Sequence, residues 1–292
     1  MSFKDSVLIE RPEIHREPVD SAAFGVVEKP LSAAERLYAT PALRKSVILV
    51  LLVLAWEIGA RLLNSELLFP TFLATSTAFV KGVASGELLL KVWVSLKVLM
   101  VGYALGILFA ALLTGIGIVS RVGTDLLETL TAMFNPLPAI ALLPIALIWF
   151  GLGKVSLVAV LVHSVVWAVA LNTHSGFRSV SATLRMVGKN YGLAGFGYVW
   201  KILIPAAFPS ILTGLKIGWA FAWRTLIASE LVFGVSSGSG GLGWYIYENK
   251  NELEIPKVFA GLLTVILIGL LVENLIFRVI ESRTVRKWGM QH

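Results

Sequence analysis

The sequence predicts an all-α membrane protein with about six transmembrane helices. Hydrophobic residues make up 57% of the 292 positions and charged residues only 15%, whereas soluble domains carry about 25% charge. Apolar runs of about 18 residues or more recur along the chain, which is the length a helix needs to cross a hydrocarbon core of roughly 30 Å. Helices are expected because lipid offers no partner to an unpaired backbone group.

Six apolar segments have a suitable length. They are residues 46–63, 95–118, 127–150, 155–172, 209–234 and 258–280. The first of them follows a charged segment, so we expect it to stay as an anchor and not to be cleaved as a signal peptide.

The segments divide the chain into three parts: a cytoplasmic N-terminal tail (1–45), a transmembrane domain (46–282) and a short cytoplasmic tail (283–292). Within the first tail, residues 31–45 have two open interpretations, an amphipathic helix on the membrane surface or a solvated tail.

The distribution of basic residues predicts the orientation. With the N-terminus inside, sixteen Lys and Arg residues fall in inner segments and five in outer segments. Cytoplasmic segments carry the excess of Lys and Arg in membrane proteins. Both termini and residues 181–209 are therefore expected on the cytoplasmic side.

Glycines and prolines modify the predicted spans. Two pairs with the spacing Gly-x-x-x-Gly, at 102–106 and 214–218, predict faces on which helices approach closely. Pro136, Pro138 and Pro144 each remove a backbone donor from the third span. Such breaks are tolerated at membrane depth where protein or a cavity covers them, and they are common at transporter binding sites. We therefore expect this span to line a passage.

Polar side chains within the spans are the next candidates, because each is costly unless paired or hydrated. Arg224 lies near the middle of the fifth span, six residues from Glu230 and thus roughly 240° around the helix from it. An anion contact and an ion pair to another span both remain open for Arg224. His163 is interpreted as a packing residue more readily than as a ligand. The candidate pathway residues are Asn135, Pro138, Pro144, His163, Trp223, Arg224 and Glu230.

Residues 181–209 are basic, rich in glycine and closed by two prolines, although long apolar runs flank them. We expect two short helices on either side of residues 192–197, with Pro205 and Pro209 starting the fifth span. A polar segment between spans is a natural contact for a soluble partner. On the outer side, residues 234–256 predict a loop with a flexible start and with Trp244 and Tyr245 at the membrane interface.

No catalytic or metal site is predicted. The sequence has no Gly-x-x-x-x-Gly-Lys-Ser/Thr motif, no cysteine and no histidines at metal-ligand spacing. The net charge of +7 resides in short loops beside apolar runs, which indicates membrane orientation and not nucleic-acid binding.

Taken together, several stretches resemble one known family, the membrane subunits of bacterial binding-protein-dependent ABC importers, and in particular the nitrate, sulfonate, taurine and bicarbonate permeases. The resemblance covers roughly residues 50–285. The matching stretches follow in order at 95–106, 137–154, 189–216, 228–230 and 237–246.

This resemblance implies a type I ABC importer fold, in which residues 181–204 form the coupling loop to an ATPase. It also implies a location in the bacterial inner membrane, two ATPase subunits that bind ATP and Mg, a second copy of this chain and an extracytoplasmic solute-binding protein. This chain itself would bind no cofactor and would pass a small anionic solute. The residues implied in ATPase coupling are Lys189, Asn190, Tyr191, Gly192, Leu193 and Pro205.

The sequence departs from the family pattern in the coupling loop and in two of the spans. The acidic-Ala-Ala start of the coupling loop is replaced by Met186, Val187 and Gly188. Asn135 stands where a basic residue is common, and Arg224 stands where an apolar residue is usual. We therefore interpret Arg224 as a positive charge that has moved from one span to another.

Two other classes of protein are weighed against this interpretation. A stand-alone channel or ion-coupled carrier would need no ATPase partner, so copurification of an ATP-binding subunit separates it from an importer subunit. A membrane-embedded enzyme would need clustered nucleophiles, metal ligands or paired carboxylates, and the sequence shows none.

Overall fold

The computed structural model describes residues 39–233 and 240–289. These residues form helices joined by short connections, and no strand occurs among them. Five helical segments are long and apolar enough to cross a membrane, and a bent pair of helices adds a sixth candidate. The predicted all-α membrane fold is confirmed.

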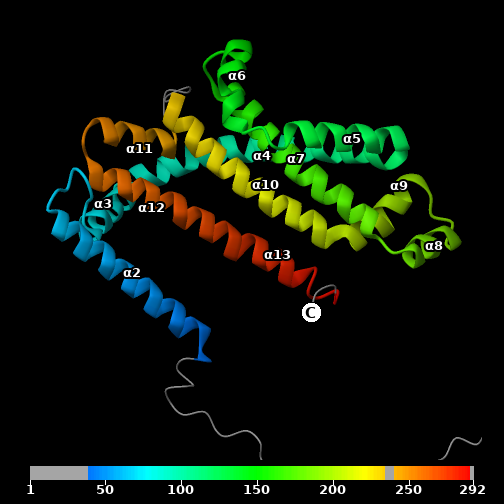
Figure 1. Ribbon diagram of the computed structural model, residues 1–292, viewed down its shortest axis with the longest axis horizontal. Helices are drawn as coiled ribbons and strands as arrows, with labels where there is room; N and C mark the ends of the chain where they lie inside the picture. Colours follow the sequence, from blue (N-terminus) through cyan, green and yellow to red (C-terminus); the bar gives the residue numbers. More distant parts are fainter. Residues whose placement is uncertain (1–38, 234–239, 290–292) are drawn as a thin grey trace, which may run out of the picture. The chain divides into compact units, whose positions relative to one another are not determined.

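The chain divides into two units, residues 1–54 and 55–292, with the boundary inside α2 (Pro41–Leu63). The further α-helices belong to the second unit (Figure 1). They are α3 (Phe72–Ala84), α4 (Glu87–Val119), α5 (Arg121–Phe134), α6 (Leu143–Phe150), α7 (Lys154–Ser179), α8 (Ala182–Asn190), α9 (Gly195–Tyr198), α10 (Ile204–Phe233), α11 (Leu242–Asn251), α12 (Ile255–Leu271) and α13 (Arg278–Arg283). A 3-10 turn, η2 (Ala139–Leu142), precedes α6, and two π-helical turns, η3 (Val199–Leu203) and η4 (Val272–Phe277), join α9 to α10 and α12 to α13.

Helix α7 lies between α4 and α10, and both glycine pairs face it. A Cβ atom added at Gly102 of α4 would lie 2.6 Å from the Cβ of Leu161, and one added at Gly214 of α10 would lie 2.8 Å from the Cβ of Asn172. Both neighbours belong to α7. The predicted close packing through small residues is confirmed.

The third predicted span is bent. Residues 127–150 were expected as one span, but α5 and the segment Ala139–Phe150 meet at 87°. Pro136 and Pro138 lie in the break. Because proline has no backbone N–H, neither residue can donate the hydrogen bond that would continue the helix. Pro144 stands in the first turn of α6, where no donor is needed, so it begins that helix and does not kink it.

The start of the fifth span also differs from the prediction. Helical structure is continuous from Gly195 to Val232, so Pro209 lies inside a helix, and Pro205, in the first turn of α10, follows helical structure and not a loop. Pro205 cannot donate to the carbonyl four residues earlier, and the wider π-helical turn η3 ends two residues before it. The second short helix accordingly begins at Gly195, inside the predicted connection 192–197.

The connections that were predicted to lie on the outer side contain more helix than expected. Helix α3 was not predicted, and α11 occupies part of the predicted loop 234–256. Tyr245 was expected at the membrane interface, but it is 1% exposed because α11 packs against α10 and α12. Residues 234–239, the expected flexible start, lie outside the described residues, as do residues 31–38 of the expected surface helix.

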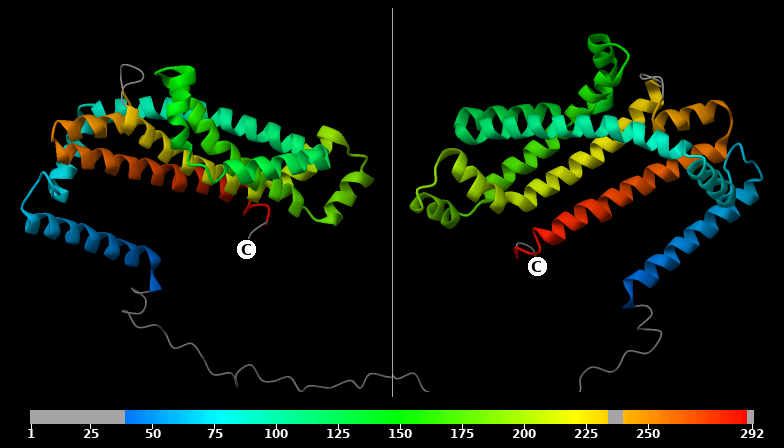
Figure 2. Two further views of the ribbon diagram at one scale, coloured as in Figure 1. Left: turned by 45° about the horizontal axis from the view of Figure 1, so that its top comes forward. Right: turned by 180° about the vertical axis from the view of Figure 1, so that it is seen from behind.

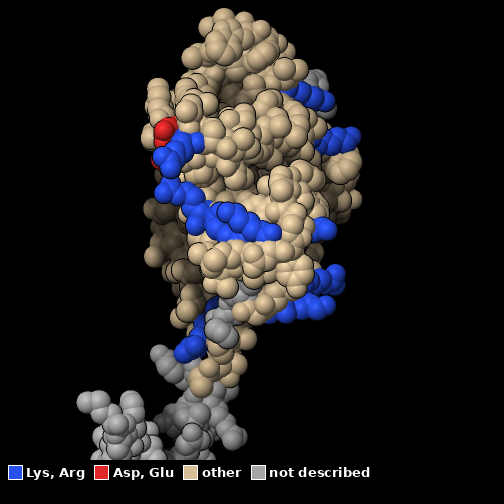
Figure 3. Space-filling model, turned by 90° about the vertical axis from the view of Figure 1, so that its right-hand side faces the viewer, with Lys and Arg blue, Asp and Glu red and all other residues tan. Residues whose placement is uncertain are grey.

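The two ends of the second unit differ in charge. Helices α8 and α9 lie at one end, beside the start of α5, whereas α3 and α11 lie at the other (Figures 1 and 2). Figure 3 looks onto the α8–α9 end, where Lys and Arg side chains form a band with few acidic groups. The elements at this end carry the exposed basic residues Arg121, Arg178, Lys189 and Lys201.

Candidate functional site

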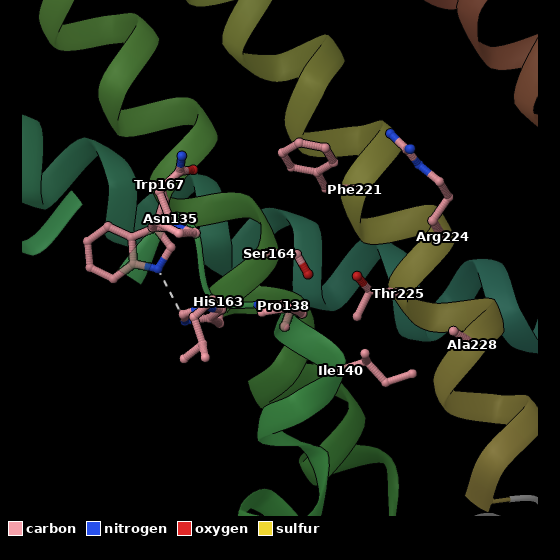
Figure 4. A pocket seen from close by; sticks show the side chains of 13 residues that line it. Asn135, Pro138, Ile140, His163, Ser164, Trp167, Phe221, Arg224, Thr225 and Ala228 are labelled. Atoms are coloured by element: carbon pink, nitrogen blue, oxygen red, sulfur yellow. Dashed lines mark hydrogen bonds between the residues drawn. The ribbon is translucent and has the colours of Figure 1, made fainter. Parts of the chain in front are cut away.

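A cavity of about 350 Å³ lies where the break between α5 and α6 faces α7 and α10. Residues 135–140 form one wall, and the side chains of Ser164 on α7 and Thr225 on α10 point toward one another across the space (Figure 4). The prolines therefore expose a stretch of non-helical backbone to a cavity, which is the arrangement that makes such backbone tolerable in a membrane.

Arg224 is the one permanently charged residue among the described residues that line this cavity. Its side chain is exposed, its Nε donates to the carbonyl of Ala220 at 3.0 Å, and its guanidinium carbon lies 5.4 Å from the ring centre of Phe221. No ion pair joins it to a carboxylate within the described parts of the chain. The other N–H groups of the guanidinium can therefore meet an anion.

The opposite wall of the cavity is aromatic. His163 lines the cavity, and its Nδ1 accepts a hydrogen bond from Trp167 Nε1 at 3.1 Å. Phe134 stacks on Trp167 with ring centres 5.4 Å apart. The ring of His163 is thus held in place by its neighbours on the wall of the cavity.

The predicted pathway residues fall into two groups. Asn135, Pro138, His163 and Arg224 come together around the cavity. Pro144, Trp223 and Glu230 do not belong to its lining. Trp223 is 5% exposed, and its Nε1 donates to the carbonyl of Val265 in α12 at 3.2 Å.

Glu230 belongs to a buried hydrogen-bond network near the C-terminal end of α10. It is 4% exposed and accepts a bond from the Ser95 hydroxyl of α4 at 2.8 Å and one from the Gly243 N–H at 2.8 Å. The Ser95 hydroxyl in turn accepts the Leu242 N–H at 2.8 Å. These contacts cap the first turn of α11, whose N–H groups have no partner within the helix. The network therefore fixes α11 to both α4 and α10.

Five of the six predicted coupling residues, Lys189 to Leu193, lie at the end of α8, whereas Pro205 lies in α10. Gly192 has a φ of 70°, its N–H bonds to the carbonyl of Lys189, and the N–H of Leu193 bonds to the carbonyl of Gly188. This pair of bonds is a Schellman motif, which needs a left-handed residue such as glycine after the cap. Tyr191, the cap residue, is 81% exposed and is presented at the end of the unit.

Several contacts near this turn were not predicted from the sequence. Gly188 is required by packing, since a Cβ there would lie 2.9 Å from the Tyr198 ring. Phe196 and Trp200 form an exposed stacked pair with ring centres 6.2 Å apart. Their spacing of four residues is the signal that could have revealed them, because such residues share one face of a helix.

Comparison with known proteins identifies the family. A model described as binding-protein-dependent transport system inner membrane component matches residues 102–286. The chain belongs to this family. It is an ABC importer permease, an integral membrane protein that takes part in transport and is not itself an enzyme.

Three relatives indicate the range of this family. The permease is 30% identical over 231 residues to an ABC transporter permease protein of Methanocaldococcus jannaschii, an alignment covering 77% of this chain and 84% of the relative. It is 31% identical over 171 residues to the taurine transport system permease protein of Escherichia coli, covering 57% and 61%. It is 27% identical over 252 residues to the nitrate import permease protein of Synechocystis, covering 82% and 88%.

Proposed function

We propose that this permease forms the membrane passage of an ATP-driven importer for a small oxyanion. The observation that carries the proposal is the unpaired Arg224 guanidinium on a cavity whose described lining contains no carboxylate. An intramembrane cation without a carboxylate partner favours an anion in the passage. The names of two relatives, which specify taurine and nitrate, support the same class of solute.

In this proposal a second copy of the chain completes the passage, and one ATPase subunit binds the α8–α9 end of each copy. The exposed Tyr191 and the basic side chains at this end would contact the ATPase. The ATP and Mg would be bound by those subunits. An extracytoplasmic binding protein would deliver the solute at the end that carries α3 and α11.

The proposed location is the bacterial inner membrane, with both termini and the α8–α9 end in the cytoplasm. The band of Lys and Arg at that end supports this orientation, because cytoplasmic segments carry the excess of basic residues. A stand-alone channel or carrier remains the competing proposal for the mechanism.

The test is purification of the tagged permease together with its ATPase subunits, followed by reconstitution into vesicles with the binding protein. We expect an ATP-binding subunit to copurify and labelled taurine or nitrate to enter only with ATP. Excess unlabelled anion should compete with the label, whereas a cationic amine of similar size should not. Uptake of the same anions by vesicles that contain only this chain would instead establish the stand-alone carrier.

A further inference from the structure

Two cavities at the α8–α9 end share part of their lining. One, of about 200 Å³, is polar, and the other, of about 860 Å³, is apolar. Ile118 of α4, Phe177 of α7, Arg185 of α8 and Leu203 of η3 line both. A single ligand with a polar and an apolar part could therefore occupy the two together.

The polar cavity is lined by cationic groups and by a buried histidine. Arg178 pairs with Glu128, which leaves Arg185 as the cation without a carboxylate partner among the described residues. Arg185 donates from Nη2 to the Phe177 carbonyl at 2.6 Å and from Nε to the Val180 carbonyl at 3.1 Å, so Nη1 remains available.

His174 also lines the polar cavity. It is 7% exposed, and neither of its ring nitrogens has a hydrogen-bond partner among the described residues. Its Nε2 lies 3.9 Å from the Glu128 carboxylate, beyond hydrogen-bond distance. A buried polar group without a partner is costly unless a ligand or water supplies the missing bond. The polar cavity is thus suited to an oxyanion that accepts from Arg185 and His174.

The apolar cavity is a groove between α4, α7 and the start of α10. It extends along α4 from Ile107 to Val119, a helical rise of about 18 Å. Half of a bilayer core is roughly 15 Å thick, so the groove has the length of one leaflet. The stacked pair of Phe196 and Trp200 lies on its rim, and aromatic side chains favour this level of a membrane.

We propose that the two cavities form one binding site for an anionic glycerophospholipid. The phosphate headgroup occupies the polar cavity beside Arg185 and His174, and an acyl chain lies in the groove. The placement of the headgroup in the cytoplasmic leaflet rests on the orientation given under the proposed function. A free oxyanion would fill the polar cavity alone, and a second protein chain in the groove would not need the adjoining cationic cavity.

The experiment measures lipid retained by the purified full-length chain, by native mass spectrometry after reconstitution in phosphatidylcholine with or without phosphatidylglycerol. We expect phosphatidylglycerol to be retained in preference. Arg185→Gln should reduce its retention roughly five-fold, the effect of about one surface cation on an anionic lipid. Lys189→Gln removes a neighbouring cation outside both cavities and should leave retention unchanged.

A second variant is needed because Arg185→Gln also removes the hydrogen bonds from Arg185 to the carbonyls of Phe177 and Val180. Gly115 lines the groove, and a Cβ there would meet no atom within 4 Å, so Gly115→Leu should fill the groove without distorting the chain. Gly59, whose Cβ would be equally free, supplies the control Gly59→Leu. Retention should fall in the first variant and not in the second.

Three outcomes would overturn the lipid site. They are equal retention of the two lipids, unchanged retention in Gly115→Leu, and displacement of the bound lipid by inorganic phosphate alone. Loss of a dimer in Gly115→Leu with lipid retention unaffected would assign the groove to a second copy of the chain. None of these readings requires an ATPase or transport, so they are separate from failure of the proposed function.

Discussion

At the scale of single residues, Arg224 lies beside the cavity that the break between α5 and α6 forms. A cation at membrane depth is costly unless it is hydrated, paired or matched by a ligand. Here the bend between α5 and α6 opens a cavity beside it. The cavity provides room for water or an anion, and under the proposed function the charge of Arg224 favours the anion.

The local potential near Arg224 can be measured with thiol reagents, because the chain has no cysteine of its own. In Thr225→Cys, the new thiol would lie on the cavity wall beside Arg224. We expect an anionic methanethiosulfonate to react faster than a cationic one, since a positive site concentrates anions. The preference should disappear when Arg224→Gln is added. A preference that persists in the double variant would show that another group sets the potential.

Glu230 shows how a charged residue in a span can have a role unlike the one the sequence suggests. Its place in an apolar segment predicts a passage, but the structure surrounds its carboxylate with donors from Ser95 and Gly243. The network could not be predicted from the sequence, because its hydrogen bonds join residues up to 147 positions apart. The matched stretches 95–106, 228–230 and 237–246 nevertheless each contribute one part of it.

Removal of the Ser95 hydroxyl should destabilise the permease. Ser95→Ala leaves the Leu242 N–H and a buried carboxylate each without one bond, so we expect a loss of about 1–3 kcal/mol in the free energy of unfolding. Denaturation in detergent micelles measures it. Ser229→Ala is the matched control, because the Ser229 hydroxyl is equally buried but bonds within its own helix. Equal effects of the two substitutions would refute the role of the network.

At the scale of elements, the turn after α8 depends on the left-handed conformation of Gly192. Gly192→Val should strain the turn by about 1–3 kcal/mol, because a β-branched residue is disfavoured at a φ of 70°. We expect the variant to insert in the membrane but to transport poorly relative to the ATP hydrolysed. Uptake and ATPase activity are measured on the same vesicles.

Gly197→Val is the control for this prediction. Gly197 is nearby, a Cβ there would meet no atom within 4 Å, and its φ is not positive. The Gly197→Val variant should therefore couple ATP hydrolysis to uptake normally. Normal coupling in Gly192→Val as well would remove the turn from the coupling mechanism.

The packing of α4 on α7 gives a second prediction for an element. A Cβ at Gly106 would collide with Val165, whereas one at Gly115 on the same helix would meet open space. Gly106→Ala should therefore lower the free energy of unfolding by about 1–3 kcal/mol through overpacking, whereas Gly115→Ala should leave it unchanged. The yield of folded chain and its thermal unfolding in detergent check both. Similar behaviour of the two variants would contradict the close approach.

The elements differ in how well the sequence predicts them. The spans and the glycine faces follow from hydropathy and spacing, which are local properties. The prolines of the third span predict a break, but the angle of 87° depends on what α5 and α6 pack against. Helix α11 was not predicted, because glycine and serine precede it and because the side chains that cap its first turn, Ser95 and Glu230, belong to other helices.

At the scale of the second unit, one continuous helical segment connects the proposed sites. The segment from Gly195 to Val232 begins beside the turn that follows α8, lines the cavity through Arg224 and reaches the network at Glu230. Movement at the α8–α9 end can therefore reach both the cavity and α11 through a single element. The Schellman turn, the cavity and the buried network are the three points at which this connection can be tested.

The most direct test of the central claim, that an anion passes Arg224 during ATP-driven import, is uptake by Arg224→Gln. The complex in vesicles would be assayed for labelled taurine or nitrate uptake and for ATP hydrolysis. We expect uptake to fall roughly ten-fold or more, as the loss of a hydrogen bond to a charged group implies, with basal ATP hydrolysis little changed. Arg224→Lys should retain more uptake than Arg224→Gln. Unchanged uptake in Arg224→Gln would contradict the account.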